Sequence, residues 1–296
     1  MPIKVPNHTR EPRGEWSISA GILFLQPVFD SNPAFIVSSA GGNVTRQVDF
    51  HSQWNAAPMV WLGYTSERGW GVRGRWFLFS NEVSESTGIA AGETIRGASP
   101  LPLGQIPVAG AATANSHLYV NVFDLQGTCT WESAYWTHVV GFGARYTHMS
   151  QDYRAAFAGP GTRIDLSADH NFNGGGPTLS FQTRRCLGES GFSLYGQALG
   201  AINFGTSSDG YVAVNNGMPQ LFTHNRTLVL PVGELEVGAE YAHTLGPARL
   251  FVQAGFAGQV WWNGGSATNL SGFGSTNSSN SNFGFLGIAL RAGIRY

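Results

Sequence analysis

The chain has 296 residues, 17 of them basic and 18 acidic, so its formal net charge is −1 and charged residues make up only 12%. Soluble domains usually carry about 25% charged residues. An aromatic content of 12% excludes a disordered chain, and the lack of a basic excess excludes a nucleic-acid-binding protein. The longest apolar runs fall far short of the roughly 20 residues of a membrane helix, which excludes a polytopic helical membrane protein.

The first segment, residues 1–14, is polar and contains proline, without the apolar stretch of a signal peptide. We expect either that the numbering starts near the mature N-terminus or that the chain is not exported by that route. No change of composition divides the remainder. The sequence therefore predicts a polar N-terminal extension over residues 1–14 and a single domain over residues 15–296.

From residue 15 onward, apolar and polar residues alternate with period two, the spacing of a β-strand. In the last segment, Phe285–Tyr296, one face is wholly apolar and the other carries two arginines among small residues. In chain order the predicted strands are Glu15–Pro27, Trp54–Thr65, Trp70–Phe79, Leu118–Gln126, Trp136–His148, Thr178–Cys186, Phe192–Phe204, Gly233–Thr244, Leu250–Trp262 and Phe285–Tyr296. The phase of Leu118–Gln126 is ambiguous, and we expect a β-bulge there.

The connections between these strands are alternately short and long, which predicts an antiparallel up-and-down meander. The long ones are rich in Gly, Ser, Asn, Pro and Thr, and we expect them to be loops: Val28–Gln53, Ser80–His117, Met149–Pro177, Gly205–Val232 and Asn263–Asn282. Eight or twelve strands remain alternatives if Leu118–Gln126 is not a strand or a loop contains another hairpin. Ser80–His117 is the first candidate for such a hairpin, or for a constriction inside the barrel.

Both a membrane barrel and a soluble sandwich have period-two strands, but two features favour the barrel. The predicted strands span the ~9–11 residues of a tilted membrane strand rather than the ~5–6 usual in soluble sheets. Aromatic residues lie toward strand ends, as in the girdles of membrane barrels; they are Trp16, Tyr64, Trp70, Trp76, Trp136, Trp261, Trp262 and Tyr296. In lipid the barrel must be closed, so the first strand should pair with the last. A soluble secreted β-protein remains the lesser alternative.

If the apolar parity faces lipid, the opposite parity lines a polar lumen. The predicted pore-lining residues are Arg73, Arg75, Arg145, Arg184, Glu234, Glu236, Glu240, Gln253, Arg291 and Arg295. Two interpretations stay open: a charged, water-filled pore, or a network of ion pairs that plugs the barrel, since about eight strands give a filled interior and about 16 an open channel. Glycines of the same parity either leave space or allow the strands to coil.

Other candidate chemistry is sparse. Asp169-His170 resembles part of a hydrolase pair, but chain neighbours rarely form a catalytic geometry, so we expect no enzyme. The eight histidines have no metal-ligand spacing, and we expect neither metal nor cofactor. Cys129 and Cys186 lie in or beside two short turns on the same side. They either form a disulfide in an oxidising periplasm or stay unpaired.

The order of several motifs resembles one family. Glu15–Pro27 (EWSISAGILFLQP), Met59–Tyr64 with Gly69–Trp76, Gly174–Leu179 with Gly191–Gly196, and the ending Leu290–Tyr296 are similar to strands of the Legionella-type major outer-membrane proteins. The resemblance covers nearly the whole chain except the long loops. It implies a pore-forming β-barrel of the bacterial outer membrane with no catalytic residues to carry over.

These observations together predict a closed, antiparallel, up-and-down transmembrane barrel of about ten strands. We expect passive diffusion of ions or small hydrophilic solutes, with outer-membrane lipid around the barrel and no nucleic-acid partner. A non-conducting structural or adhesive barrel with partner-binding loops is the alternative. Neither the oligomeric state nor the solute follows from the residues.

Overall fold

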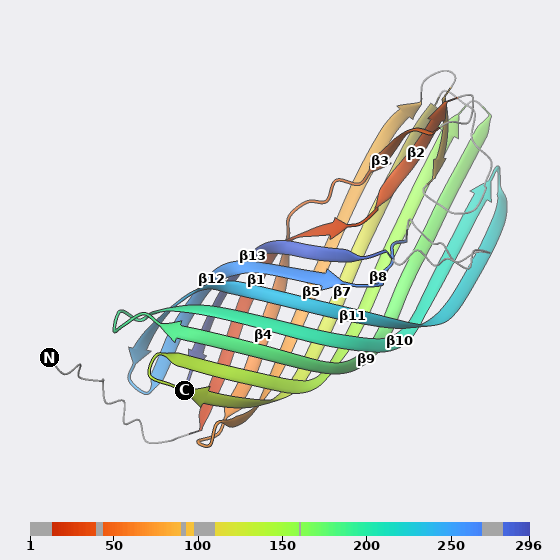
Figure 1. Ribbon diagram of the computed structural model, residues 1–296. Coiled ribbons are helices and arrows are strands. Elements are labelled where there is room, and N and C mark those ends of the chain that lie inside the picture. Colours follow the sequence, from red (N-terminus) through yellow and green to blue (C-terminus); the bar gives the residue numbers. More distant parts are fainter. Residues whose placement is uncertain (1–13, 40–43, 90–92, 98–109, 160, 268–280) are drawn as a thin grey trace.

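In the computed structural model, ten strands form a closed antiparallel barrel, which confirms the predicted fold (Figure 1). The structure describes residues 14–39, 44–89, 93–97, 110–159, 161–267 and 281–296, so most of the predicted extension over residues 1–14 lies outside the described part. The ring strands are β1 (Glu15–Phe29), β4 (Asn55–Thr65), β5 (Trp70–Ile89), β7 (Gly110–Glu132), β8 (Trp136–Gly159), β9 (Thr162–Cys186), β10 (Phe192–Asn215), β11 (Met218–Leu245), β12 (Ala248–Trp261) and β13 (Phe283–Arg295). No helix in this part of the chain has the length and apolarity to cross a membrane.

The first and last strands close the ring, as predicted. β1 and β13 pair from Ser17↔Arg295 to Phe29↔Phe283. Trp16 and Tyr296 exchange two backbone hydrogen bonds at the end of this seam, of 2.7 and 2.8 Å. The register is continuous along the seam, as a strand in lipid requires.

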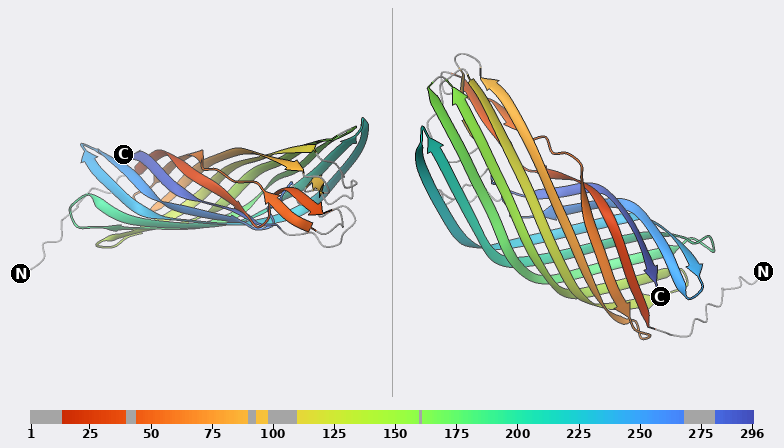
Figure 2. Two further views of the ribbon diagram at one scale, coloured as in Figure 1. Left: turned by 90° about the horizontal axis from the view of Figure 1, so that it is seen from above. Right: turned by 180° about the vertical axis from the view of Figure 1, so that it is seen from behind.

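The barrel wall is tall on one side and low on the other (Figures 1 and 2). β1, β4, β12 and β13 have 11 to 15 residues, whereas β5 and β7–β11 have 20 to 28. The predicted loops Met149–Pro177 and Gly205–Val232 are therefore wrong, because both are extensions of strands joined by tight turns. At about 3.3 Å per residue, these six strands continue well beyond the ring as an open, curved sheet. It is here called the extracellular sheet, because we expect the short turns of such a barrel to face the periplasm.

The predicted bulge in Leu118–Gln126 is also wrong, since β7 pairs with β5 and β8 in unbroken register. What changes along β7 is the surroundings. Phe123 and Leu125 face outward and are about half exposed, whereas Val120 and Val122 face inward and are buried. The strand passes from a level with lipid outside and a polar lumen to a level with water outside and an apolar interior. The apolar parity therefore reverses while the backbone stays regular.

A second, three-stranded sheet packs against the inner face of the extracellular sheet. It has the order β3 (Val44–Asp49), β2 (Pro33–Ser39), β6 (Glu93–Gly97). Phe35 and Val37 of β2, with Ile95 of β6, share one buried apolar core with residues of β7–β10 such as Phe157. Ser80–His117 therefore contributes β6 to this sheet, and adds no hairpin to the ring among the described residues.

The hydroxyl of Tyr153 on β8 ties the two sheets together, because it donates a 2.8 Å hydrogen bond to the carbonyl of Ala34. We expect Tyr153→Phe to weaken this docking by about 1–2 kcal/mol, since the buried carbonyl loses its donor. Protease cleavage within residues 30–54 of the barrel in proteoliposomes should then become about 5- to 30-fold faster. Tyr119→Phe, on the outward face of β7, is the control. Equal cleavage rates in both variants would contradict the prediction.

The outward face at ring level is an apolar belt. Ile22, Leu62, Leu194, Phe256 and Leu286 are each 45–72% exposed there, which suits contact with acyl chains. Among the predicted girdle aromatics, Trp16, Trp70, Trp136 and Tyr296 are exposed near the short-turn end. Trp261 does not belong to the girdle, because it points inward and is fully buried.

Candidate functional site

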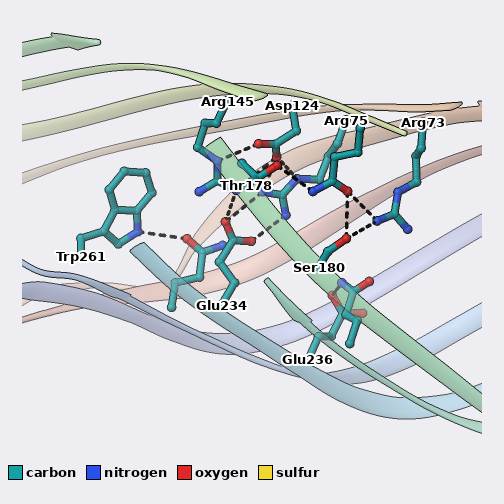
Figure 3. A network of polar contacts seen from close by, with 12 residues as sticks. Arg73, Arg75, Asp124, Arg145, Thr178, Ser180, Glu234, Glu236 and Trp261 are labelled. Atoms are coloured by element: carbon teal, nitrogen blue, oxygen red, sulfur yellow. Dashed lines mark hydrogen bonds and ion pairs between the residues drawn. The ribbon is translucent and has the colours of Figure 1, made fainter. Parts of the chain in front are cut away.

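All ten predicted pore-lining residues point into the barrel and contribute to a polar layer at membrane level. Alternation along β5, β8, β9 and β11–β13 turns their side chains inward, where ion pairs and hydrogen bonds hold them in separate groups. Figure 3 shows the group that contains Arg75, Arg145 and Glu234. The interior thus contains the ion-pair network that the sequence allowed as one of two interpretations.

Two arginines and two carboxylates form a closed square in this layer. Arg75 bonds Asp124 at 2.7 Å and Glu234 at 2.6 Å, and Arg145 bonds the same two carboxylates at 2.7 and 2.6 Å. The side chain of Arg145 is 0% exposed and that of Asp124 is 2% exposed. Charges buried this way stay favourable only while every partner remains in place. The square therefore ties β5, β7, β8 and β11 rigidly across the lumen.

A second group lies nearer the short-turn end. Glu236 accepts hydrogen bonds from Arg291 (3.0 Å), the hydroxyl of Tyr195 (2.7 Å) and the amide of Gln197 (2.9 Å). Glu240 accepts from Arg184, Arg295 and Gln253, at 3.2, 2.9 and 2.8 Å. Because Gln253 also accepts from Arg291 at 2.8 Å, it joins the two carboxylates into one chain of contacts.

Sequence reasoning missed Asp124, the anion at the centre of the square. It lies in Leu118–Gln126, whose phase looked ambiguous because the apolar parity reverses inside that segment. It also missed Trp61, whose inward ring lies 4.6 Å from the guanidinium of Arg73 and 5.2 Å from that of Arg75. The reversal itself was a usable signal for Asp124. Asp124 and Gln126 share the parity of Val120 and Val122, so all four side chains point to the same face of the strand.

An apolar layer lies directly above the polar one and receives side chains from all ten ring strands. Leu25, Phe79, Phe172, Trp261 and Phe285 are fully buried in it. The rings of Phe79 and Phe285 meet across the lumen with centroids 4.6 Å apart. This layer packs as a hydrophobic core and fills the cross-section of the barrel.

The cavity beside Trp61, Arg73 and Arg75 is small, with about 20 Å³ accessible to water. The inward glycines do not widen the lumen. A Cβ at Gly143 would collide with the carbonyl of Leu125, and one at Gly287 with that of Phe24. Of the two alternatives for these glycines, space in the lumen or coiling of the strands, the second holds, because they allow close approach of curved strands.

The two cysteines are both free, so the second alternative holds and no disulfide joins them. Cys129 pairs with Trp70 across the β5–β7 ladder and shares its outward face. Cys186 points inward, where the hydroxyl of Ser193 contacts its sulfur at 3.8 Å. β8 also separates their strands, which puts the two Cα atoms beyond the reach of a disulfide.

Asp169 and His170 cannot act as a pair, because alternation directs them to opposite faces of β9. His170 is buried and contacts Asp209, whereas Asp169 lies outside, opposite Asp152 of β8. Burial, together with Asp152 and Asp209, raises the pKa of Asp169. Among the described residues, no group of His, Cys, Asp and Glu could hold a metal ion.

A hollow of about 430 Å³ lies on the outer face of the extracellular sheet, beyond the apolar belt. Its lining comes from four adjacent strands and includes Thr113, Arg154, Asp165, Ser167 and Val212. Arg154 is exposed and forms no ion pair with the part of the chain described here, whereas Asp165 pairs with Arg163. The hollow therefore presents an exposed cation, a paired carboxylate and small polar groups on the outer face of the sheet.

Comparisons with known proteins agree with this architecture. The family model described as Legionella pneumophila major outer membrane protein precursor matches residues 5–295. No curated protein matches the chain. Among solved structures, the outer membrane protease OmpT from Escherichia coli is 11% identical with a TM-score of 0.51, covering 95% of this chain and 96% of that one. Ail from Yersinia pestis, in complex with a heparin analogue, is 11% identical, with coverages of 96% and 99% and a TM-score of only 0.27. The likeness to OmpT shows the fold alone.

Proposed function

Because this chain belongs to the family of the Legionella pneumophila major outer membrane protein, and is a β-barrel of the bacterial outer membrane, we propose that it is a non-conducting barrel that anchors a rigid sheet at the cell surface. One observation carries the proposal: two successive layers fill the barrel. Ion pairs occupy the membrane level, and a hydrophobic core occupies the level above it. A solute crossing the barrel would have to disrupt both the ion-pair layer and the hydrophobic layer.

The extracellular sheet is the part of the molecule that a surface role would use. Its strands continue the ring without a hinge, and β2, β3 and β6 brace it from inside. The hollow around Arg154 gives it an outward-facing place for contact with a polar or anionic partner. We also propose that the protein is not an enzyme, which the opposite orientations of Asp169 and His170 support.

Passive diffusion of ions or small hydrophilic solutes is the second candidate function. The observation that favours it is the polarity of the membrane-level interior. An anchor needs no charged lumen, and burying charge is costly even in pairs. A narrow, charge-lined path for small ions would retain such residues.

Single-channel recording in planar lipid bilayers separates the two candidates. We expect no conductance steps from barrels whose insertion is verified by heat-modifiable mobility and protease protection. Discrete steps, with a selectivity that Arg291→Glu alters, would overturn the closed-barrel proposal and support diffusion. A porin from the same preparation serves as the positive control.

A further inference from the structure

Arg73 is a cation without an anion. Its terminal nitrogens donate to the side-chain oxygens of Gln126 (2.8 Å), Ser180 (3.0 Å) and Gln182 (3.2 Å), which are all neutral. Its Nε is buried and has no hydrogen-bond partner in the described structure. Because arginine stays protonated in proteins, this guanidinium carries a full charge, and no carboxylate among the described residues forms an ion pair with it.

Two further guanidinium groups lie beside Arg73, and both are already paired with carboxylates, so they do not supply it with a counter-ion. The guanidinium groups of Arg73, Arg75 and Arg291 lie 4.6, 5.2 and 5.6 Å from the ring of Trp61. The polar layer as a whole holds six arginines against four carboxylates; these are Arg73, Arg75, Arg145, Arg184, Arg291 and Arg295, with Asp124, Glu234, Glu236 and Glu240. An excess of buried charge of one sign is costly without a counter-ion.

The cavity of about 20 Å³ lies at this cluster. Trp61, Arg73, Arg75 and Gln182 line it, and the indole N–H of Trp61 is a second buried donor that lacks an acceptor. Glu234 and Glu236 also line the cavity, but Arg75, Arg145 and Arg291 already neutralise them. The walls therefore offer the positive charge of the Arg73 guanidinium to a small species in the cavity.

We propose that this cavity binds a monatomic anion, chloride under physiological conditions, beside the guanidinium of Arg73. The positive charge of Arg73 selects an anion. The small cavity is the reason to name a monatomic ion rather than phosphate, sulfate or a carboxylate. The site does not depend on the proposed function, because it would neutralise the lumen whether or not the barrel conducts.

Crystals of the full-length barrel grown with bromide in place of chloride test this directly. We expect an anomalous bromide peak in the cavity, in contact with the Arg73 guanidinium, and no peak there in Arg73→Gln. Arg163→Gln, on the exposed end of β9, is the matched control and should keep the peak. A cavity that holds water only, or bromide only elsewhere, would overturn the site.

Thermal unfolding gives a second measurement that does not need crystals. At constant ionic strength, replacing gluconate by chloride should raise the melting temperature of the wild type saturably, by about 2–4 °C. The melting temperature of Arg73→Gln should not respond. An equal response in both proteins, or in neither, contradicts the proposal. Since neither experiment measures conductance, failure here is distinguishable from failure of the proposed function.

Discussion

Arg145→Met should lower the free energy of unfolding of the barrel by about 3–5 kcal/mol, because it leaves Asp124 and Glu234 to share the single positive charge of Arg75. The side chain of Arg145 is 0% exposed, so water cannot take its place. Urea unfolding in lipid vesicles, followed by tryptophan fluorescence, measures the change. Adding Glu234→Gln to Arg145→Met should recover part of the loss, since the double variant restores the charge balance of the square.

Two controls separate this effect from the loss of a positive charge in general. Arg163→Met removes an exposed partner of Asp165 and should change stability by less than about 1 kcal/mol. Arg73→Met leaves no carboxylate unpaired and should also cost far less than Arg145→Met. If Arg145→Met is as stable as the wild type, the square is solvated in the membrane, and a water-filled lumen becomes the better description.

Phe285→Ala should cost about 3–5 kcal/mol, because it opens a cavity in the apolar layer where Phe285 packs against Phe79 and Phe283. Phe285→Leu keeps most of the volume and should cost less than about 1.5 kcal/mol. The same urea titration measures both variants. Equal midpoints for Phe285→Ala and the wild type would mean that this level of the barrel is hydrated rather than packed.

The ring and its lumen were predictable because lipid imposes one rule on every strand: apolar side chains outside and polar ones inside. Phe285–Tyr296 and Gly233–Thr244 follow that rule, so alternation alone directs Arg291, Glu236 and Glu240 to the inner face of the barrel. Their partners were not predictable, since the sequence does not give the register between strands. Which carboxylate contacts Arg75 depends on the register between each pair of neighbouring strands.

The extracellular sheet was missed because the rule reverses there. Over residues 164–172, Ile164, Leu166 and Phe172 point inward, while Asp165 and Asn171 point outward. Residues 164–172 belong to the same strand as Thr178–Cys186, but their apolar side chains lie on the opposite face. A search for a single apolar face along the strand therefore interprets residues 164–172 as a loop. Trp261 was assigned to the girdle for the same reason, because an aromatic residue at the end of a ring strand can also point inward.

The β1–β13 seam has a consequence for biogenesis. The strand that completes the ring is the last to leave the ribosome, and until it arrives β1 and β12 each present an open edge. A chain truncated before residue 283 therefore lacks the strand that pairs with β1 and cannot form this closed ring in a bilayer. Conversely, the start of β1 and the end of β13 lie side by side, where Trp16 and Tyr296 bond each other. A circular permutant that joins them and opens the tight turn at Gly246 should assemble into the same closed ring, with a different strand as its final piece.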